Sequence, residues 1–412
     1  MMASALASLG AQQGTLLVGA ARIDITPPAD AALPMSGYSD RKQGFKSIHD
    51  HIYVRAIVLS DGKTDAAILA WELIGMPTAV SQDLSQRISK GLGIPADRLI
   101  LAAEHVHSAP TVAGAYVAGT PATIAYTAKL EDWAYKAVSE AKAHLQPAKF
   151  GFGTGKCYIN INRREAYPKG SPYGAWWLGY NPNGPSDKTV WVLKFESLSG
   201  KPIALFINYS VHGTVMGEDN LEVSGDLPGA TSRFVENFYE GKIPNTRPDA
   251  GWELELQPQE KVGENGVVAL WTSGPAGDQN PIVDDSGEDF SMANALGRIL
   301  GEESVRVARD INNMASQARI WGLQQVLTCP GRQRQHGSQT SGSIQAAPPV
   351  KIRLSLLMLN NIAFAGVSGE VLTPIFFRLK NESPFNSTIM VTHANGLSGY
   401  IPNDAAYKEK SY

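Results

Sequence analysis

The chain has 412 residues, of which 43% are hydrophobic and 18% are charged, a composition typical of a globular protein. Its formal net charge of -3 and the lack of a basic cluster argue against nucleic acid as a partner. No apolar run reaches the ~18 residues of a membrane-spanning helix, so we expect no transmembrane segment. The oligomeric state stays open at this level.

The predicted elements mix strands and helices without strict alternation. Apolar, periodic segments predict helices at 77–92, 123–145 and 289–308. Runs rich in Val, Ile and Leu predict strands at 16–25, 51–59, 66–74, 98–103, 190–195, 202–210 and 354–367. The Gly-, Pro- and Asn-rich stretch 151–190 predicts a long structured loop, and the polar stretch 329–348 predicts a surface excursion. We therefore expect an α/β fold of mixed sheets with flanking helices.

The N-terminal residues and the two cysteines each allow more than one interpretation. Residues 1–15 are mostly small and apolar, which we interpret as the remnant of a secretion signal or a disordered N-terminus. This interpretation predicts a secreted or periplasmic protein, with a cytoplasmic location as the alternative. Cys157 and Cys329 are too few and too far apart for a cysteine-based zinc site, and whether they pair is left open.

Histidine is scarce, with eight residues in the chain, yet three histidines follow predicted strands. His105 and His107 lie two positions apart directly after one strand, and in an extended chain such residues project to the same face. His212 follows another strand and precedes a glycine. Because neutral imidazole binds zinc well, these positions are a candidate zinc nucleus. The alternative is that each is an ordinary core or surface histidine.

Three glycine-flanked turns each carry an acidic residue that could serve such a site. Asp226 lies in the turn 224–229, and Asp278 lies in the turn 274–281. Glu370 is the last residue of the segment 366–370, which follows a predicted strand. Each segment can equally be a plain turn, since Gly, Asp, Asn and Pro are turn formers. None matches a phosphate-binding loop or a dinucleotide fingerprint.

Short motifs along the chain occur in an order that resembles a known family. They are GAARIDITP at 19–27, MSGY at 35–38, IHD at 48–50, AEHVHSAP at 103–110, NINR at 160–163, HGT at 212–214, SGD at 224–226, AGD at 276–278, SGE at 368–370 and ANGLSGYIP at 394–402. Taken together they are similar to the catalytic domain of the neutral/alkaline, non-lysosomal ceramidases. Each motif alone is weak, but their common order extends from about residue 16 to the end of the chain.

The resemblance implies that residues 16–412 form a zinc-hydrolase catalytic domain with the fold of that family. It implies Zn²⁺ as the cofactor and, as its ligands, His105, His212, Glu370 and Tyr400. It further implies an acid/base or substrate-orienting role for His107, and contacts to substrate from Arg163 and Tyr412.

Such a centre predicts hydrolysis by metal-activated water. Zinc lowers the pKa of a bound water to roughly 7 and polarises a carbonyl. We expect His107, Arg163 and Tyr412 to supply hydrogen bonds to the developing oxyanion, and His107 to protonate the leaving group. Asp226 or Glu72 is expected to hold a ligand histidine through its second nitrogen. Two histidines and one carboxylate also suit non-haem iron, but the tyrosine and the family likeness argue against it.

Two departures from the family pattern bear on the substrate, which we expect to be a small molecule or lipid-like. Ceramidases have a serine near the metal where this chain has Asn280, and they continue into an immunoglobulin-like domain, before which the sequence here ends. Asparagine can donate a hydrogen bond to an oxyanion, so Asn280 is also a catalytic candidate. It is longer and planar, however, and it cannot reproduce a hydroxyl that both donates and accepts. We therefore expect cleavage of an amide or ester in something smaller or more polar than ceramide, and poor ceramidase activity.

Two other functions remain open from the sequence. The aromatic residues of the loop, Tyr173, Trp176, Trp177 and Tyr180, could form a platform for a glycan or another polar conjugate, or could simply pack the loop down. A metal-containing binding module without catalysis is the further alternative. The complete set of implied metal ligands counts against that last alternative.

Overall fold

The structure is a computed structural model that describes residues 13–38, 41, 43–169, 171, 176–242, 266–284, 289–334, 344–385 and 387–409. Tyr173 and Tyr412 lie outside the described residues. Among the described residues, no helix is long and apolar enough to cross a membrane. Cys157 is buried and Cys329 is half-buried, and both are free thiols.

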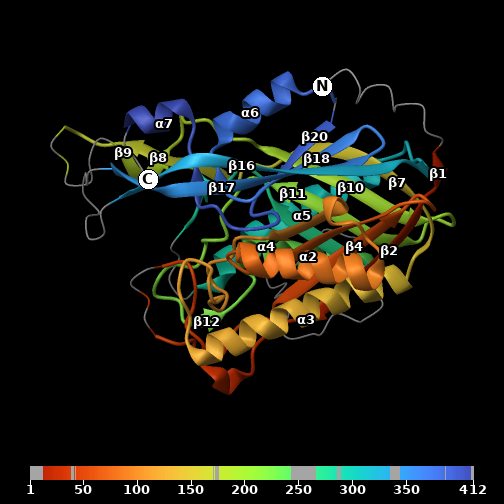
Figure 1. The fold of residues 1–412 in the computed structure, drawn as a ribbon, viewed down its shortest axis with the longest axis horizontal. Helices are drawn as coiled ribbons and strands as arrows, with labels where there is room; N and C mark the ends of the chain where they lie inside the picture. The colour runs from red at the N-terminus through yellow and green to blue at the C-terminus, as the bar shows by residue number, and fades with distance from the viewer. Residues whose placement is uncertain are drawn as a thin grey trace, which may run out of the picture.

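An eight-stranded mixed sheet forms the centre of the molecule (Figure 1). In spatial order its strands are β13 (Val268–Ser273), β11 (Pro202–Tyr209), β10 (Thr189–Ser197), β7 (Gln146–Lys156), β2 (Leu17–Asp24), β4 (Tyr53–Ser60), β5 (Asp65–Trp71) and β6 (Leu99–Ala103). The pairs β5–β6 and β11–β13 are parallel, and the other neighbours are antiparallel. The expected α/β fold of mixed sheets with flanking helices is therefore confirmed.

A four-stranded sheet packs on one face of the central sheet. It contains β16 (Ile320–Arg334), β17 (Ile344–Leu359), β18 (Ile362–Val367) and β20 (Ser387–Val391), with β18 and β20 parallel. Side chains alternate along the strands of the central sheet, as a period of two requires. In β4, Ile57 and Leu59 join the core shared with the second sheet, whereas Val54 and Val58 belong to the opposite face.

Helices cover that opposite face, with α2 and α3 below the sheet in Figure 1. The helices on that face are α2 (Thr78–Leu92), α3 (Pro121–Ala143), α4 (Asp226–Tyr239) and α5 (Phe290–Asp310). Helix α6 (Thr373–Glu382) instead packs against the core of the second sheet, and it lies with α7 (Asp404–Glu409) at the top of Figure 1. Short 3₁₀ turns lie at Ala29–Ala31 and Ala96–Arg98. The helix ends follow local chemistry. The Thr120 side chain caps α3 by accepting from the Thr123 N–H, Asp289 caps α5, and Gly93 ends α2 with φ 70°.

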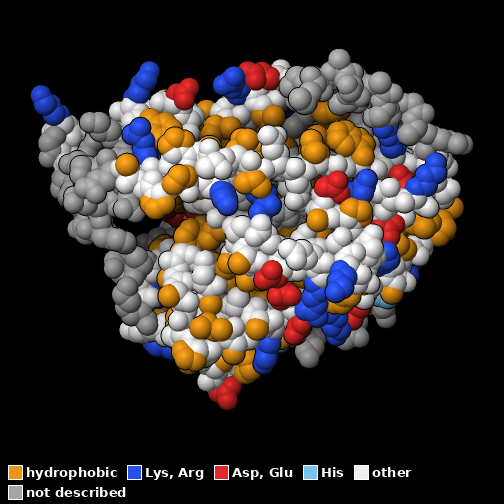
Figure 2. Space-filling model, viewed as in Figure 1, with side chains coloured by type: hydrophobic (Ala, Val, Ile, Leu, Met, Phe, Trp, Pro, Cys, Tyr) orange, Lys and Arg blue, Asp and Glu red, His pale blue; other side chains and the backbone are white. Residues whose placement is uncertain are grey.

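Smaller ribbons complete the fold and hold loops near the strand ends. They are the three-stranded sheet β14 (Gln279–Pro281), β8 (Asn160–Ala166) and β9 (Trp176–Asn181), and the pairs β1 (Gly14–Thr15) with β15 (Gln317–Ala318), β3 (Ser47–Ile48) with β12 (Glu222–Val223), and β19 (Glu370–Val371) with β21 (Tyr400–Ile401). The face seen in Figure 2 carries basic and acidic side chains interspersed, without a continuous basic stripe.

Three sequence predictions about elements were wrong. Residues 151–190 are not one loop, because they include part of β7, all of β8 and β9, and the start of β10. The stretch 329–348 belongs at both ends to the long antiparallel strands β16 and β17. The single strand expected at 354–367 is two strands that reverse at Asn360, whose φ is 52°.

Candidate metal centre

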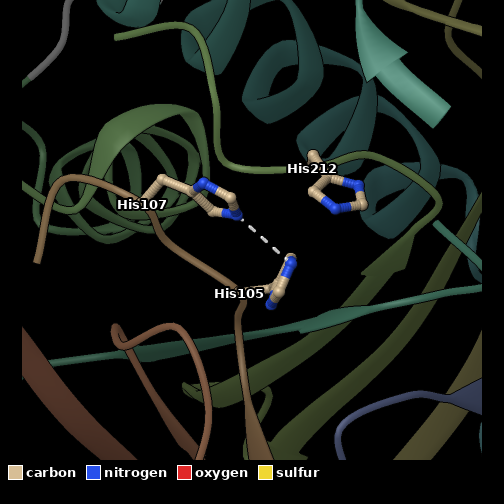
Figure 3. Close-up of side chains that lie close together, drawn as sticks. All are labelled: His105, His107 and His212. Carbon is tan, nitrogen blue, oxygen red and sulfur yellow. Dashed lines mark hydrogen bonds between the residues drawn. The ribbon is translucent and has the colours of Figure 1, made fainter. Parts of the chain in front are cut away.

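Three histidines from two neighbouring segments meet where strands of the central sheet end. His105 and His107 follow β6, and His212 follows β11. A parallel bridge between Val106 and Gly213 joins the two segments, with the His107 N–H donating to the Gly213 carbonyl at 3.0 Å. Figure 3 shows the three imidazole rings converging from these segments. Their ligand-type nitrogen atoms all lie within 4.8 Å of one another.

His105 and His107 approach each other, but the backbone between them is not extended as predicted. The sequence argument places both rings on one face of an extended chain. In the structure His105 has a left-handed φ of 63°, which breaks the extended run. The His107 Nε2 then lies 3.3 Å from the His105 Nε2. A non-glycine residue held at positive φ is uncommon, and such strain is concentrated at functional sites.

Glu370 brings a carboxylate to the same point from the second sheet. It follows β18, and its Oε2 lies 3.4 Å from the Nε2 of His105 and 3.4 Å from the Nε2 of His212. The Nε2 of His212 and the Oε2 of Glu370 are buried without a hydrogen-bond partner among the described residues. Tetrahedral ligands at ~2.0–2.2 Å from a zinc ion lie ~3.3–3.6 Å apart, so the spacing fits one small metal ion.

Backbone carbonyls orient both histidines toward this point. The Nδ1 of His105 lies 2.7 Å from the Ile74 carbonyl, and the Nδ1 of His212 lies 3.0 Å from the Gln279 carbonyl. A carbonyl oxygen only accepts hydrogen bonds, so each Nδ1 carries the proton and each Nε2 keeps its lone pair for a metal. The expectation that Asp226 or Glu72 orients a ligand histidine was wrong.

Those two carboxylates serve other contacts. Asp226 accepts from the Met216 N–H at 3.1 Å and from the Leu227 N–H at 2.6 Å, at the start of α4. Burial raises the pKa of Asp226 to about 6. Glu72 pairs with the fully buried Arg55, which also binds Glu236 on α4. These two acids therefore hold α4 and the loop after β11 in place beneath the centre.

The electrostatics of the centre favour neutral rings at His107 and His212 and an ionised carboxylate at Glu370. Burial, with the neighbouring His105, holds the pKa of His107 well below its usual value, and burial lowers the pKa of His212 to about 3. Burial opposes ionisation of Glu370, but the neighbouring His105, His212 and His393 together outweigh it and keep the pKa of that carboxyl well below its usual range. Neutral nitrogen and anionic oxygen are the forms that bind a divalent cation.

Tyr400 lies beside Glu370 on a paired strand. The two residues are direct partners in the parallel ladder of β19 and β21, so their side chains share one face. The Tyr400 hydroxyl accepts from the Arg163 Nη2 at 2.9 Å, and the Arg163 Nη1 donates to the Asn280 Oδ1 at 3.1 Å. The Asn280 Nδ2 donates to Asp284. Asn280 thus contacts Arg163, and Arg163 contacts the phenol.

A cavity of about 630 Å³ opens onto the centre. Its lining includes His105, His107, Glu370 and Tyr400 together with apolar and polar residues of the segments 34–41 and 111–123. His212, Arg163 and Asn280 do not line this cavity. Of the described residues that do, none belongs to β9, which carries the aromatic residues Trp176 and Trp177.

Three residues near the centre escaped the sequence analysis. His393 stacks on the His105 ring with centroids 4.1 Å apart and an interplanar angle of 14°. The Tyr116 hydroxyl donates to the Glu370 Oε1 at 2.9 Å, and Arg41 donates to the His107 carbonyl. Only His393 carried a usable signal, because it is one of few histidines and directly follows the apolar run that forms β20.

Comparisons with known proteins agree with this geometry. The chain matches the family described as neutral/alkaline non-lysosomal ceramidase, N-terminal, over residues 16–364. It is 25% identical to neutral ceramidase B of Dictyostelium discoideum over 406 residues, which cover 93% of this chain and 49% of that protein. It is 29% identical to neutral ceramidase A of the same organism over 253 residues, covering 56% of this chain and 33% of that protein. The chain therefore spans about half or less of these curated relatives.

Solved structures show the same fold at low sequence identity. A ceramidase complexed with C2 matches with a TM-score of 0.76 and 16% identity, covering 97% of this chain and 71% of that one. The neutral ceramidase from Pseudomonas aeruginosa matches with a TM-score of 0.73 and 17% identity, covering 97% and 70%. With the match over residues 16–364, these findings show that the chain belongs to the neutral/alkaline non-lysosomal ceramidase family.

Proposed function

We propose that this protein is a zinc-dependent hydrolase that cleaves an amide, or an ester, at the centre described above. The observation that carries the proposal is the spacing of three buried ligand atoms. The Glu370 Oε2 lies 3.4 Å from the Nε2 atoms of both His105 and His212, which suits tetrahedral zinc. Bound zinc would lower the pKa of water to roughly 7 and polarise the scissile carbonyl.

Four residues are proposed as ligands: His105, His212, Glu370 and Tyr400. The ladder pairing of Tyr400 with Glu370 supports the phenol as the fourth ligand. His107 is proposed to remain outside the ligand set. In support, the described ion pairs of Glu370 include His105 and His212 but not His107.

The surrounding residues have separate proposed roles. His107 exchanges a proton with the reacting groups, since it is neutral, buried and lines the cavity. Arg163 holds the Tyr400 phenol through its Nη2, and Asn280 in turn fixes Arg163. Tyr412, which lies outside the described residues, is proposed to donate to the carbonyl oxygen of the substrate.

Asn280 also supports a substrate other than long-chain ceramide. Its amide oxygen accepts from Arg163 and its amide nitrogen donates to Asp284, so both ends are engaged. It is therefore poorly placed to act at a scissile carbonyl as a serine hydroxyl would. We propose a substrate smaller or more polar than ceramide. Export from the cell, predicted from the N-terminus, remains a proposal alongside it.

The test uses purified full-length protein, stripped with chelator and reloaded with Zn²⁺, on a panel of N-acyl amides, esters and glycosides. We expect amide or ester cleavage that disappears on stripping and returns with zinc. Glu370→Gln should abolish it, whereas Glu382→Gln, an exposed acid paired only with Arg378 in the described contacts, should not change it. Full activity in stripped protein or in Glu370→Gln would contradict the proposal.

The substrate claim needs its own arm of that experiment. Short-chain ceramide in detergent should be turned over far more slowly than the best small amide. Turnover of ceramide on the order of ten per second, an ordinary enzyme rate, would show that Asn280 does not limit the substrate. Cleavage of glycosides alone would instead favour the polar-conjugate alternative.

A further inference from the structure

Arg41 is a buried cation at the wall of the cavity. Its side chain lines the cavity that also contains His105 and His107, and the residue is 8% exposed. Burial lowers the pKa of Arg41 to about 10, so the guanidinium stays charged at neutral pH. The other charged residue lining the cavity among the described residues is Glu370, whose carboxylate faces the two histidines.

Among the residues that the structure describes, no carboxylate balances this charge at close range. Arg41 Nη1 donates to the Asn220 carbonyl at 2.9 Å, and Nη2 donates to the carbonyls of Ser36 and His107. Within the described part of the chain, the Nε has no hydrogen-bond partner, and no acid there lies within ion-pair distance of the guanidinium. The exposed Glu218 acts on it only as a more distant charge. Besides these carbonyls, the guanidinium lies over the Tyr38 ring, 5.0 Å from its centroid. A buried charge whose contacts are all neutral is costly, and buried cations are normally paired.

The carbonyl contacts show that Arg41 also joins the loops around Ser36, His107 and Asn220. A residue that served only to join loops would not need to lie at the cavity wall or keep an unpartnered N–H. The two roles of Arg41 can be told apart by experiment. An unpaired charge favours binding of an anionic ligand, whereas a residue that only joins loops does not.

We propose that Arg41 forms an anion subsite and that the substrate carries a carboxylate next to its scissile amide, as an N-acyl amino acid does. This inference rests on the proposed function and narrows its substrate class. The apolar lining residues Met35, Ile74 and Val117 can accommodate an acyl chain in the same cavity. Arg41 and His107 are joined through the His107 carbonyl, so an anion at the guanidinium lies on the His107 side of the centre.

The test compares an N-acyl glycine with the matching N-acyl glycinamide, which replaces the carboxylate with a neutral amide. Zinc-loaded wild type should prefer the acid by roughly ten- to a hundredfold in kcat/KM, the value of a hydrogen bond to a charged group. Arg41→Met should remove the preference by losing the acid substrate selectively, and Arg41→Lys should keep part of it. The control Arg87→Met removes an exposed arginine that pairs with Asp132 and should change neither substrate.

The possible outcomes separate the inference from the proposed function. Equal efficiency on both substrates in wild type, or an equal loss on both in Arg41→Met with zinc retained, overturns the inference and leaves zinc-dependent hydrolysis intact. If neither amide is cleaved, calorimetry with zinc-loaded wild type still decides, because N-acyl glycine should bind tenfold or more tightly than the glycinamide. Equal or absent binding then overturns the anion subsite. If Arg41→Met fails to fold, the wild-type ratio and Arg41→Lys give the same decision.

Discussion

Tyr400 is a proposed zinc ligand, whereas His107 is proposed to transfer protons without binding the metal. Replacing His107 with Gln should leave zinc bound but lower kcat by ~10²–10⁴-fold, the usual effect of losing an acid/base group. Replacing Tyr400 with Phe should weaken zinc binding, because it removes an oxygen that the Arg163 contact holds in place. Zinc content by elemental analysis and kcat at saturating zinc would measure both effects. An empty site in His107→Gln together with a full one in Tyr400→Phe would reverse the two roles.

His393 is a residue whose effect on zinc should pass through His105. Its ring lies parallel to that of His105, and it is 2% exposed with φ 52°. His393→Phe keeps a flat ring against His105 and should keep zinc affinity, whereas His393→Ala should lose ~10–100-fold, as is typical for a residue that orients a ligand. Both variants have the same backbone strain. Competition with a chelator measures the affinities, and equal affinity in the two variants would rule out stacking as the cause.

At the scale of single residues, the candidate ligand histidines could be identified from the sequence, but the groups that orient them could not. His105 and His212 could be chosen because histidines are few and these follow strands. Their partners are the carbonyls of Ile74 and Gln279, which carry no signal in their side chains. Arg41 was missed because its contacts are also to backbone carbonyls, from segments distant in sequence.

At the scale of elements, glycine misled the sequence analysis where two layers pack closely. The strand β7 contains Gly151 and Gly153, and a Cβ at Gly153 would lie 2.9 Å from the Val307 Cγ1 on α5. Glycine there allows the helix to approach the sheet, although its frequency suggested a loop. In β16, Leu323 and Leu327 are exposed, so the apolar alternation of a half-buried strand is weak there.

The turn containing Gly37 positions His107 from the side. Gly37 has φ 100°, and a Cβ there would lie 2.3 Å from the His107 Nδ1. Gly37→Ala should therefore displace the ring and lower kcat by tenfold or more, and it should lower the free energy of unfolding by about 1–2 kcal/mol from the left-handed backbone. Gly62→Ala is the matched control, since its φ is 80° but nothing lies within 4 Å. It should show the stability loss alone, and equal kcat losses in both variants would contradict the steric account.

At the scale of the whole molecule, the site is built where three parallel pairs end together. β6 leads to His105, β11 leads to His212, and β18 leads to Glu370, so the central sheet and the second sheet both contribute. Most strands of the central sheet and the mixed α/β fold could be predicted from the sequence. The packing of two sheets could not, because it depends on pairings such as β18 with β20, whose partners are separated by helix α6.

Burying several neutral histidines in one place makes the metal-free protein sensitive to acid. Burial lowers the pKa of His212 to about 3 and lowers that of His393 well below its usual value. Below pH ~6.5 these histidines are protonated in the unfolded chain but stay neutral in the folded chain. The free energy of unfolding should therefore fall as pH drops from about 6.5 towards 3, by up to about 1.4 kcal/mol per pH unit for each such group.

Urea unfolding of chelator-treated protein between pH 7.5 and 5 measures this slope. His393→Phe removes one of these groups and should give a shallower slope, whereas His144→Gln, an exposed histidine, should leave it unchanged. A slope in His393→Phe as steep as in wild type would mean that His393 does not stay neutral in the folded protein.

The central claim is that one zinc ion binds between His105, His212 and Glu370 with Tyr400 as the fourth protein ligand. The most direct measurement is a crystal structure of zinc-loaded protein with anomalous data collected above and below the zinc edge. The account predicts one peak, ~2.0–2.2 Å from the Nε2 of His105, the Nε2 of His212, the Oε2 of Glu370 and the Tyr400 oxygen. A zinc peak elsewhere, or one bound by His107 in place of Glu370, would contradict it.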